Sequence, residues 1–240
     1  MNAYMSNMEL EVTGNGIIAD YYSKYPNHSS LEIDIEHFIK CYLGLNINYE
    51  SFADSAKLGF LSDGETPVDI WRNGKAIPVI FPKNTIVIDR FLLTPKEYNR
   101  RRFTLAHEAA HFIISRMKKI EPDKAFFHSE FDCEKEYTFE ELRKELNITE
   151  RQADRLGAIF LMSRPNVEEA LFVCNADTPI KIYSNTVCSA KDKEIIKDAA
   201  LKMGVSQTAL RIRLEELKLL EHHEISEYIT GELHIGGTCN

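Results

Sequence analysis

The sequence predicts an α+β protein that is mainly helical, with a small, mostly antiparallel sheet ahead of a long helix. Short runs rich in β-branched and aromatic residues lie within residues 45–93 and are separated by turn residues. From Pro95 onward, apolar residues recur at spacings of three and four, the period of an amphipathic helix. We expect a domain over residues 1–165 and a helical C-terminal region over residues 166–240.

The composition is that of an ordinary globular protein, because 44% of the 240 residues are hydrophobic and 28% are charged. A formal net charge of −8 argues against broad electrostatic affinity for nucleic acid. The five cysteines are widely spaced without a C-x-x-C pair, so they indicate neither a disulfide framework nor a cysteine zinc site. No signal-peptide pattern and no apolar run of about 20 residues is present, so we expect a cytoplasmic protein without a membrane segment. No pattern indicates an oligomeric state.

The first predicted helix covers residues 31–45 and ends at Gly44, since LEIDIEHFIKCYLGL repeats apolar residues at helical spacing. No element is predicted for residues 1–30, which begin polar and continue into a tyrosine-rich stretch. Four strand-like runs follow, namely LNINYESF, VDIWR, IPVIF and TIVIDRFL. The dipeptide Asn73-Gly74 between the second and third runs is typical of a two-residue β-hairpin turn. These runs make up the predicted sheet.

The long helix is predicted over residues 95–117, with Pro95 suited to its first turn. Residues 118–148 are charged and lack a sustained apolar period, so they predict a long loop with one short helix, TFEELRKEL. Thr149 is the expected N-cap of a further helix over residues 150–162.

Two histidines one helical turn apart stand out in the HEAAH segment of the long helix. His107 and His111 at i and i+4 share one helix face, so each imidazole can give a nitrogen to the same ion. Glu108 projects beside that face, where it can reach a water on the metal and act as the general base of peptide hydrolysis. The alternative is a pair of histidines that hydrogen-bond within a buried core.

A catalytic zinc site normally has a third protein ligand, and Glu150 is the best candidate. Asp154 lies one turn later, where it can accept the free N–H of a ligand histidine and fix its tautomer. The alternative is a solvated acidic first turn that complements the helix dipole. Glu141, Glu145 and His128 are rivals, but they lie in the charged insert without a partner at this spacing.

Zinc is the default ion for two histidines and a carboxylate, with manganese as the alternative. Hydrolysis also needs a group that stabilises the oxyanion of the transition state. Tyr98, Tyr137 and Tyr183 are candidates by their chemistry alone.

The block RRRFTLAHEAAHF resembles the signature R-F-T-x-A-H-E-x-x-H of the ImmA/IrrE metallopeptidases. ERQADRLGAIFLM is similar to that family's E-x-x-A-[ND]-x-[FL]-A-A-x-L-L-M-P, although LMSRP replaces its ending here. IDIEHFIKCYLGLNI and GVSQTALRIRLEELKLL are also similar to family segments, so the resemblance covers roughly residues 31–220. The insert before Glu150 is longer than the family pattern.

This resemblance implies a zinc-dependent, gluzincin-like endopeptidase. On its pattern, His107 and His111 are metal ligands, Glu108 is the catalytic base, Glu150 matches the third-ligand glutamate and Asp154 the position behind a ligand. Members of the family typically cleave a helix-turn-helix transcriptional repressor, so a protein of that kind is the expected partner.

The C-terminal region predicts a helix pair with helix-turn-helix rhythm near residues 192–220. Its second helix carries Arg211 and Arg213, which makes DNA contact through residues 199–217 one interpretation. We favour a pair that packs on the core or grips a protein partner, because Glu215 and Glu216 accompany the arginines on an acidic chain.

Two classes of function follow from these observations. The first is a metallopeptidase that acts on a regulatory protein. The second is a metal-containing regulator that binds DNA or a protein partner without proteolysis. Glu108 favours the first, because the chain has this glutamate together with both histidines. Hydrolysis of a non-peptide amide would use the same metal site.

Overall fold

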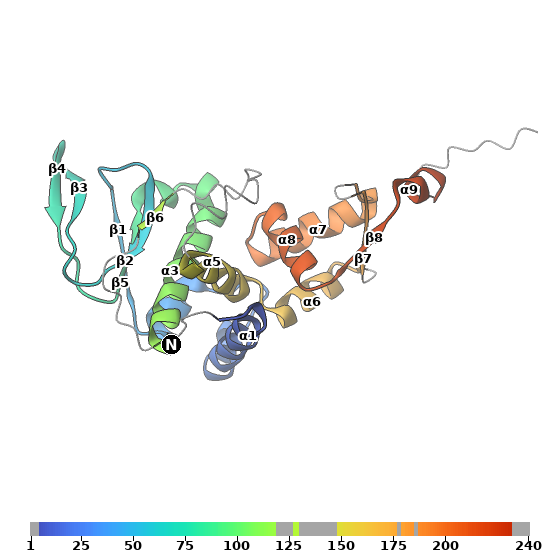
Figure 1. Ribbon diagram of the computed structural model, residues 1–240, viewed down its shortest axis with the longest axis horizontal. Coiled ribbons are helices and arrows are strands. Elements are labelled where there is room, and N and C mark those ends of the chain that lie inside the picture. The colour runs from blue at the N-terminus through green and yellow to red at the C-terminus, as the bar shows by residue number, and fades with distance from the viewer. Residues whose placement is uncertain (1–4, 119–126, 130–147, 177–178, 185–186, 232–240) are drawn as a thin grey trace, which may run out of the picture. The chain divides into compact units, whose positions relative to one another are not determined.

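The protein is an α+β chain whose computed structural model describes residues 5–118, 127–129, 148–176, 179–184 and 187–231 (Figure 1). It divides into two compact units, residues 1–163 and 164–240. Within the described ranges, no helix is long and apolar enough to cross a membrane.

The elements of unit 1 include three main helices, short helical turns and a set of strands. In chain order they are α1 (Asn7–Lys24), η1 (Pro26–His28), α2 (Ile35–His37), η2 (Phe38–Tyr42), β1 (Asn46–Glu50), β2 (Lys57–Leu61), β3 (Val68–Arg72), β4 (Lys75–Val79), β5 (Thr85–Asp89), η3 (Arg90–Leu93), η4 (Pro95–Glu97), α3 (Tyr98–Lys118), β6 (Phe127–Ser129) and α5 (Ile148–Leu161). Those of unit 2 are α6 (Arg164–Val173), β7 (Ile180–Tyr183), α7 (Ala190–Met203), α8 (Gln207–Glu216), β8 (Leu220–His223) and α9 (Ile225–Gly231).

Helix α1 is not among the predicted elements. It begins with a capping box, in which the Ser6 side chain accepts from the Glu9 N–H and the Glu9 carboxylate accepts from the Ser6 N–H. Leu10, Ile18 and Tyr21 recur at helical spacing and are buried. The Ser6-x-x-Glu9 pattern is the signal that identifies this helix start.

The helix predicted over residues 31–45 begins later than expected. Asp34 caps it by accepting a hydrogen bond from the His37 N–H at 2.9 Å, so the segment before it stays non-helical. Helix α2 then continues into η2, a π-helical turn. The chain leaves it at Gly44, whose φ of 70° confirms the predicted end.

The main sheet has the strand order β1-β5-β2-β6. Every residue of β5 is buried, which agrees with the apolar run Ile86–Ile88 at its middle and with the internal place of this strand in the sheet. β5 pairs parallel with β1 and antiparallel with β2, so the predicted, mostly antiparallel sheet contains one parallel pair. Strand β2 was not predicted, because Gly59 interrupts its short apolar pattern. β6 adds to β2 from within the charged insert.

Strands β3 and β4 form the predicted hairpin. Asn73 and Gly74 have φ values of 52° and 75°, as a type I′ turn requires, and Arg72 pairs with Lys75 across it. The hairpin encloses an aromatic and aliphatic cluster with the sheet, made of Phe52, Phe60, Val68, Ile70, Phe81 and Val87.

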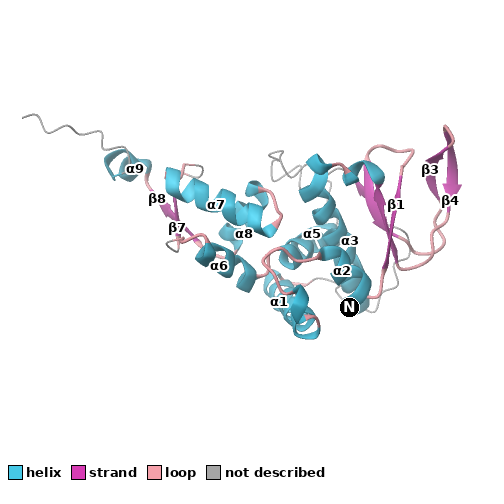
Figure 2. Ribbon diagram, turned by 180° about the vertical axis from the view of Figure 1, so that it is seen from behind, coloured by secondary structure: helices cyan, strands magenta, loops and turns pink. Residues whose placement is uncertain are grey.

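Helices α3, α5 and α1 complete unit 1. Figures 1 and 2 show the hairpin, the sheet, α3, α5 and α1 following one another across the unit. Thr149 is already helical in α5, whose described part starts at Ile148, so it is not the N-cap that its sequence suggests. The short helix predicted at TFEELRKEL lies outside the described residues.

Unit 2 contains the predicted helix pair. Gly204, with a φ of 61°, ends α7, and the Ser206 side chain caps α8 by accepting from the Ala209 N–H. The parallel pair β7–β8 was not expected in this mainly helical region. The sequence indicates β7 by the alternation of apolar Ile180 and Ile182, which are buried, with Lys181, which is exposed.

Candidate metal centre

Helix α3 buries the polar residues of HEAAH inside unit 1. His107 and Glu108 are each 1% exposed, and His111 is 8% exposed. Polar groups enclosed to this degree need partners, because an unpaired buried polar group is costly. Small residues surround them and allow neighbouring elements to approach: Ala106, Ala109 and Ala110.

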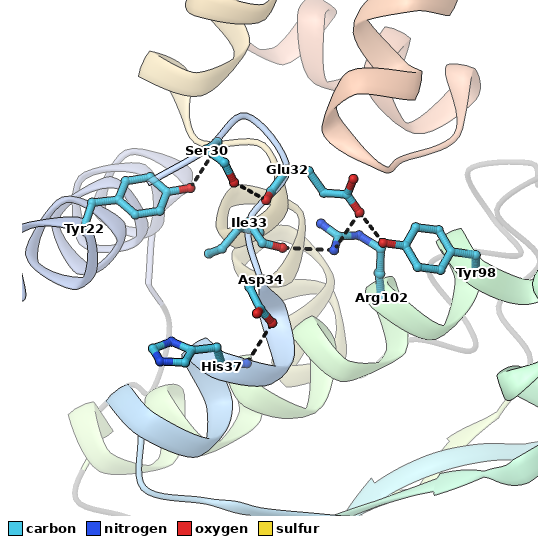
Figure 3. A network of polar contacts seen from close by, with 8 residues as sticks. All are labelled: Tyr22, Ser30, Glu32, Ile33, Asp34, His37, Tyr98 and Arg102. Carbon is cyan, nitrogen blue, oxygen red and sulfur yellow. Dashed lines mark hydrogen bonds and ion pairs between the residues drawn. The ribbon is translucent and has the colours of Figure 1, made fainter. Parts of the chain in front are cut away.

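The N-terminal half of α3 is anchored by a polar network (Figure 3). The buried Arg102 guanidinium donates to the Ile33 carbonyl at 2.9 Å and pairs with the Glu32 carboxylate at 3.2 Å. The Tyr98 hydroxyl donates to the same carboxylate. This network ties α3 to the segment before α2. It also occupies the hydroxyl of Tyr98, one of the three tyrosines considered for the oxyanion.

Helix α5 brings Glu150 to the two histidines of α3. The Nε2 atoms of His107 and His111 lie 2.9 Å apart. One Glu150 oxygen lies 3.3 Å from the Nε2 of His107, and the other lies 3.4 Å from the Nε2 of His111. Among the described residues, this is the one set of three potential ligands whose donor atoms lie within 4.8 Å of one another.

Asp154 lies behind His107, one turn along α5 from Glu150. Its Oδ1 is 2.7 Å from the Nδ1 of His107. A carboxylate accepts from Nδ1–H, so this contact selects the tautomer whose Nε2 lone pair faces Glu150. The structure thus places Glu150 beside both Nε2 atoms and Asp154 behind His107, as their spacing predicts.

Within the described part of the chain, the Glu108 carboxylate lacks a close polar contact of the kind that Asp154 makes with His107. Neither of its carboxylate oxygens makes a hydrogen bond of good geometry with a described residue. Burial raises the pKa of Glu108, and the charges of His107 and His111 and the backbone of Leu61 only partly offset this effect. A buried carboxyl group without a partner is costly and calls for an explanation beyond packing.

The acidic groups around His107 shift its protonation in the metal-free protein. Burial opposes a charge on His107, but hydrogen bonds to Asp154 and Glu150 outweigh it and raise the pKa of His107 to about 10. Burial acts against ionisation of Glu150 too, yet its hydrogen bonds to the two histidines hold the Glu150 pKa well below its usual range. The cluster thus favours one positive charge on a histidine.

The three residues fit a divalent ion. Two imidazole nitrogens and one carboxylate oxygen are a donor set of catalytic zinc sites. A tetrahedral ion with bonds of about 2.0–2.1 Å separates its ligand atoms by about 3.3 Å. The two Nε2 atoms lie 2.9 Å apart, and each lies 3.3–3.4 Å from a different oxygen of Glu150, so the three groups are spaced on the scale that such an ion needs.

For the other sequence candidates, the described residues give less information. Glu141, Glu145 and Tyr137 lie outside the described residues, and only the backbone of His128 is described. Tyr183 belongs to β7 of unit 2.

The arginines of the helix pair differ sharply in exposure. The Arg213 side chain is 1% exposed and pairs with Glu216 at 3.2 Å, while Arg211 is partly exposed. Arg213 is therefore part of the interior of unit 2, which corrects the interpretation that it faces DNA. The Arg213 side chain lies inside because it shares its helix face with the buried Leu210 and Leu214.

Two contributions to the centre were not anticipated from the sequence. Leu61 of β2 places its backbone beside Glu108, and α1 packs against α5. The capping box of α1 was the available signal for that helix, whereas Gly59 weakens the signal for β2. Comparisons with protein-family models and with curated proteins find no match to this chain.

Proposed function

We propose that this protein is a zinc-dependent endopeptidase of the ImmA/IrrE type. His107, His111 and Glu150 would hold the zinc ion. The observation that carries the proposal is Glu108, a buried carboxyl group without a good hydrogen-bond partner directly beside the three ligand candidates. A purely structural metal site has no use for such a group, whereas hydrolysis requires a base next to the reacting water.

Each residue has a distinct task in this reaction. Zinc in the centre would polarise the scissile carbonyl and lower the pKa of a coordinated water towards about 7. Glu108 takes the proton of the attacking water and delivers it to the leaving amide nitrogen. Asp154 keeps the His107 ring in the orientation and tautomer that ligation requires. A raised pKa makes the Glu108 carboxylate a stronger base than an exposed glutamate, which suits a group that takes a proton from water.

The proposed substrate is a regulatory protein, such as a helix-turn-helix transcriptional repressor. This part of the proposal rests on the resemblance of the HEAAH and ERQAD segments to that family. The buried Arg213 agrees with it, since a helix pair that hides this arginine is less suited to read DNA itself.

The test compares the full-length wild type with Glu108→Gln. Both proteins are loaded with zinc, their metal content is measured, and new protein N-termini are mapped in extracts of cells that express each one. We expect equal metal content and loss of the cleavage products in the variant. Glu168→Gln, on an exposed side chain that pairs with Arg164, is the matched control and should cleave normally.

The second class of function predicts a different result. A regulator that acts without proteolysis would keep its biological effect in Glu108→Gln and lose it when His111→Ala removes a ligand. Persistence of the effect in Glu108→Gln would refute the peptidase proposal.

A further inference from the structure

Helix α5 touches α3 without an intervening side chain. Gly157 lies on the face of α5 that carries Glu150 and Asp154, at spacings of seven and three residues. A Cβ atom at Gly157 would stand 3.0 Å from the backbone nitrogen of His107 and 3.1 Å from its Cα. The two helices therefore meet backbone to backbone at the first histidine, and α5 has no room to move closer.

The opposite face of α5 packs against α1. Gln152, Leu156 and Ile159 follow one another at spacings of four and three, about 200° round the helix axis from the Glu150 face. The Gln152 amide donates to the Met5 carbonyl at 2.8 Å. Helix α5 is thus enclosed between α3 and the N-terminal segment of the chain.

The contact with α1 is also close because of a glycine. A Cβ atom at Gly14 would stand 2.5 Å from the Cγ2 of Ile159 and 3.1 Å from the Cδ1 of Leu156. Gly16 on the same helix has no atom within 4 Å of the corresponding position. The absence of a side chain is therefore required at Gly14 and not at Gly16.

These contacts bear directly on the third ligand. Glu150 lies in the first turn of α5, and Gln152, two residues later, links that turn to Met5. Metal–ligand distances tolerate deviations of only about 0.2 Å. With a Cβ at Gly14, α1 and α5 would have to move apart to restore an ordinary carbon–carbon contact of about 3.5–4.0 Å with Ile159. This displacement is several times larger than the tolerance of a metal–ligand distance.

We propose that α1 is a positioning element of the metal centre, in which Gly14 and Gln152 hold α5 against α3 so that Glu150 reaches both histidines. This inference rests on the proposed metal site. It assigns to the N-terminal helix a role in ligand placement, although none of its residues belongs to the ligand set.

The experiment measures the zinc affinity of the folded, full-length protein by competition with a chromophoric chelator. Gly14→Ala is compared with Gly16→Ala, which makes the same chemical change on the same helix in open space. We expect roughly tenfold weaker zinc binding in Gly14→Ala and unchanged binding in Gly16→Ala. Loss of a residue that supports a metal ligand typically weakens metal affinity by about 10–100-fold, and the expected value is the lower end of this range. Gln152→Met, which keeps the length and loses the donor, should weaken binding in the same direction.

A double-mutant cycle separates ligand placement from general stability. Glu150→Ala should weaken binding strongly in the wild type and much less in the Gly14→Ala background, where Glu150 no longer ligates well. Equal effects of Glu150→Ala in both backgrounds, or wild-type affinity in Gly14→Ala and Gln152→Met, would overturn the inference.

Two outcomes distinguish the failure of this inference from that of the proposed function. If the wild type itself binds no zinc, both proposals fail together. If it binds zinc through Glu150 and the α1 variants bind equally well, only the positioning role fails. A Gly14→Ala protein that does not fold is replaced by Gln152→Met, and normal affinity in that variant has the same meaning.

Discussion

Zinc binding to this protein should depend steeply on pH, because the metal-free centre holds a proton that the ion must displace. The pKa of His107 is raised to about 10, so its imidazole is protonated at neutral pH in the metal-free state. A solution at pH about 7 is about three pH units below this pKa, so removing the proton from His107 costs about 4 kcal/mol. Each unit of rising pH removes about 1.4 kcal/mol of that cost. The apparent zinc Kd should therefore fall about tenfold per unit until the pH approaches about 10.

The assay is zinc affinity at pH about 6.5, 7.5 and 8.5, with a chelator whose own protonation is corrected for. Calorimetry in two buffers of different ionisation enthalpy counts the protons released. Burial also raises the pKa of Glu108, so Glu108→Gln serves as the control that isolates the proton of His107. About one proton should leave that variant for each zinc bound.

A Kd that is flat over this range, with no proton released, would refute the reasoning. It would mean that His107 is already neutral in the metal-free protein and that Asp154 and Glu150 do not stabilise its charge. The sign is also decisive, because affinity that falls with rising pH contradicts displacement of a proton from a histidine.

Two further predictions concern residues outside the ligand set. Asp154→Ala should weaken zinc binding by about 10–100-fold, with a smaller loss in Asp154→Asn because the amide oxygen still accepts from His107; chelator competition measures both, and equal affinity of all three proteins would contradict the orienting role. Arg213→Ala should destabilise the protein by about 2–4 kcal/mol in urea unfolding, since it empties a buried volume and removes the partner of Glu216. A loss below about 1 kcal/mol would contradict the buried placement of Arg213.

Most of the residues at the centre were identified from the sequence because their spacing is local. Two histidines at i and i+4, and two acidic residues at i and i+4, share a helix face wherever the segment is helical. Only the meeting of the two helices had to come from tertiary structure. Their position beside one another is now described, while metal binding and hydrolysis stay predictions.

Helix α1 and strand β2, which surround the centre, were harder to predict from the sequence. Helix α1 has a weakly apolar face that contains Gly14, and glycine lowers helix propensity where the chain needs close packing. Gly59 has the same effect in β2, since a Cβ there would meet the side chains of Ile88 and Thr104. In both elements the close contact that explains the glycine lies far away in sequence, so local patterns do not reveal it.

The junction of Met5 with Gln152 has a consequence for how the chain folds during synthesis. Its two residues are 147 positions apart, so the N-terminal helix leaves the ribosome long before its packing partner exists. At about 5–20 residues per second, that delay is roughly 7–30 seconds. During this time α1 lacks the contacts that Leu156 and Ile159 of α5 provide in the folded protein. Helix α1 is thus made early and α5 near the end of unit 1, so the contact that supports Glu150 can form only after nearly the whole unit has been synthesised.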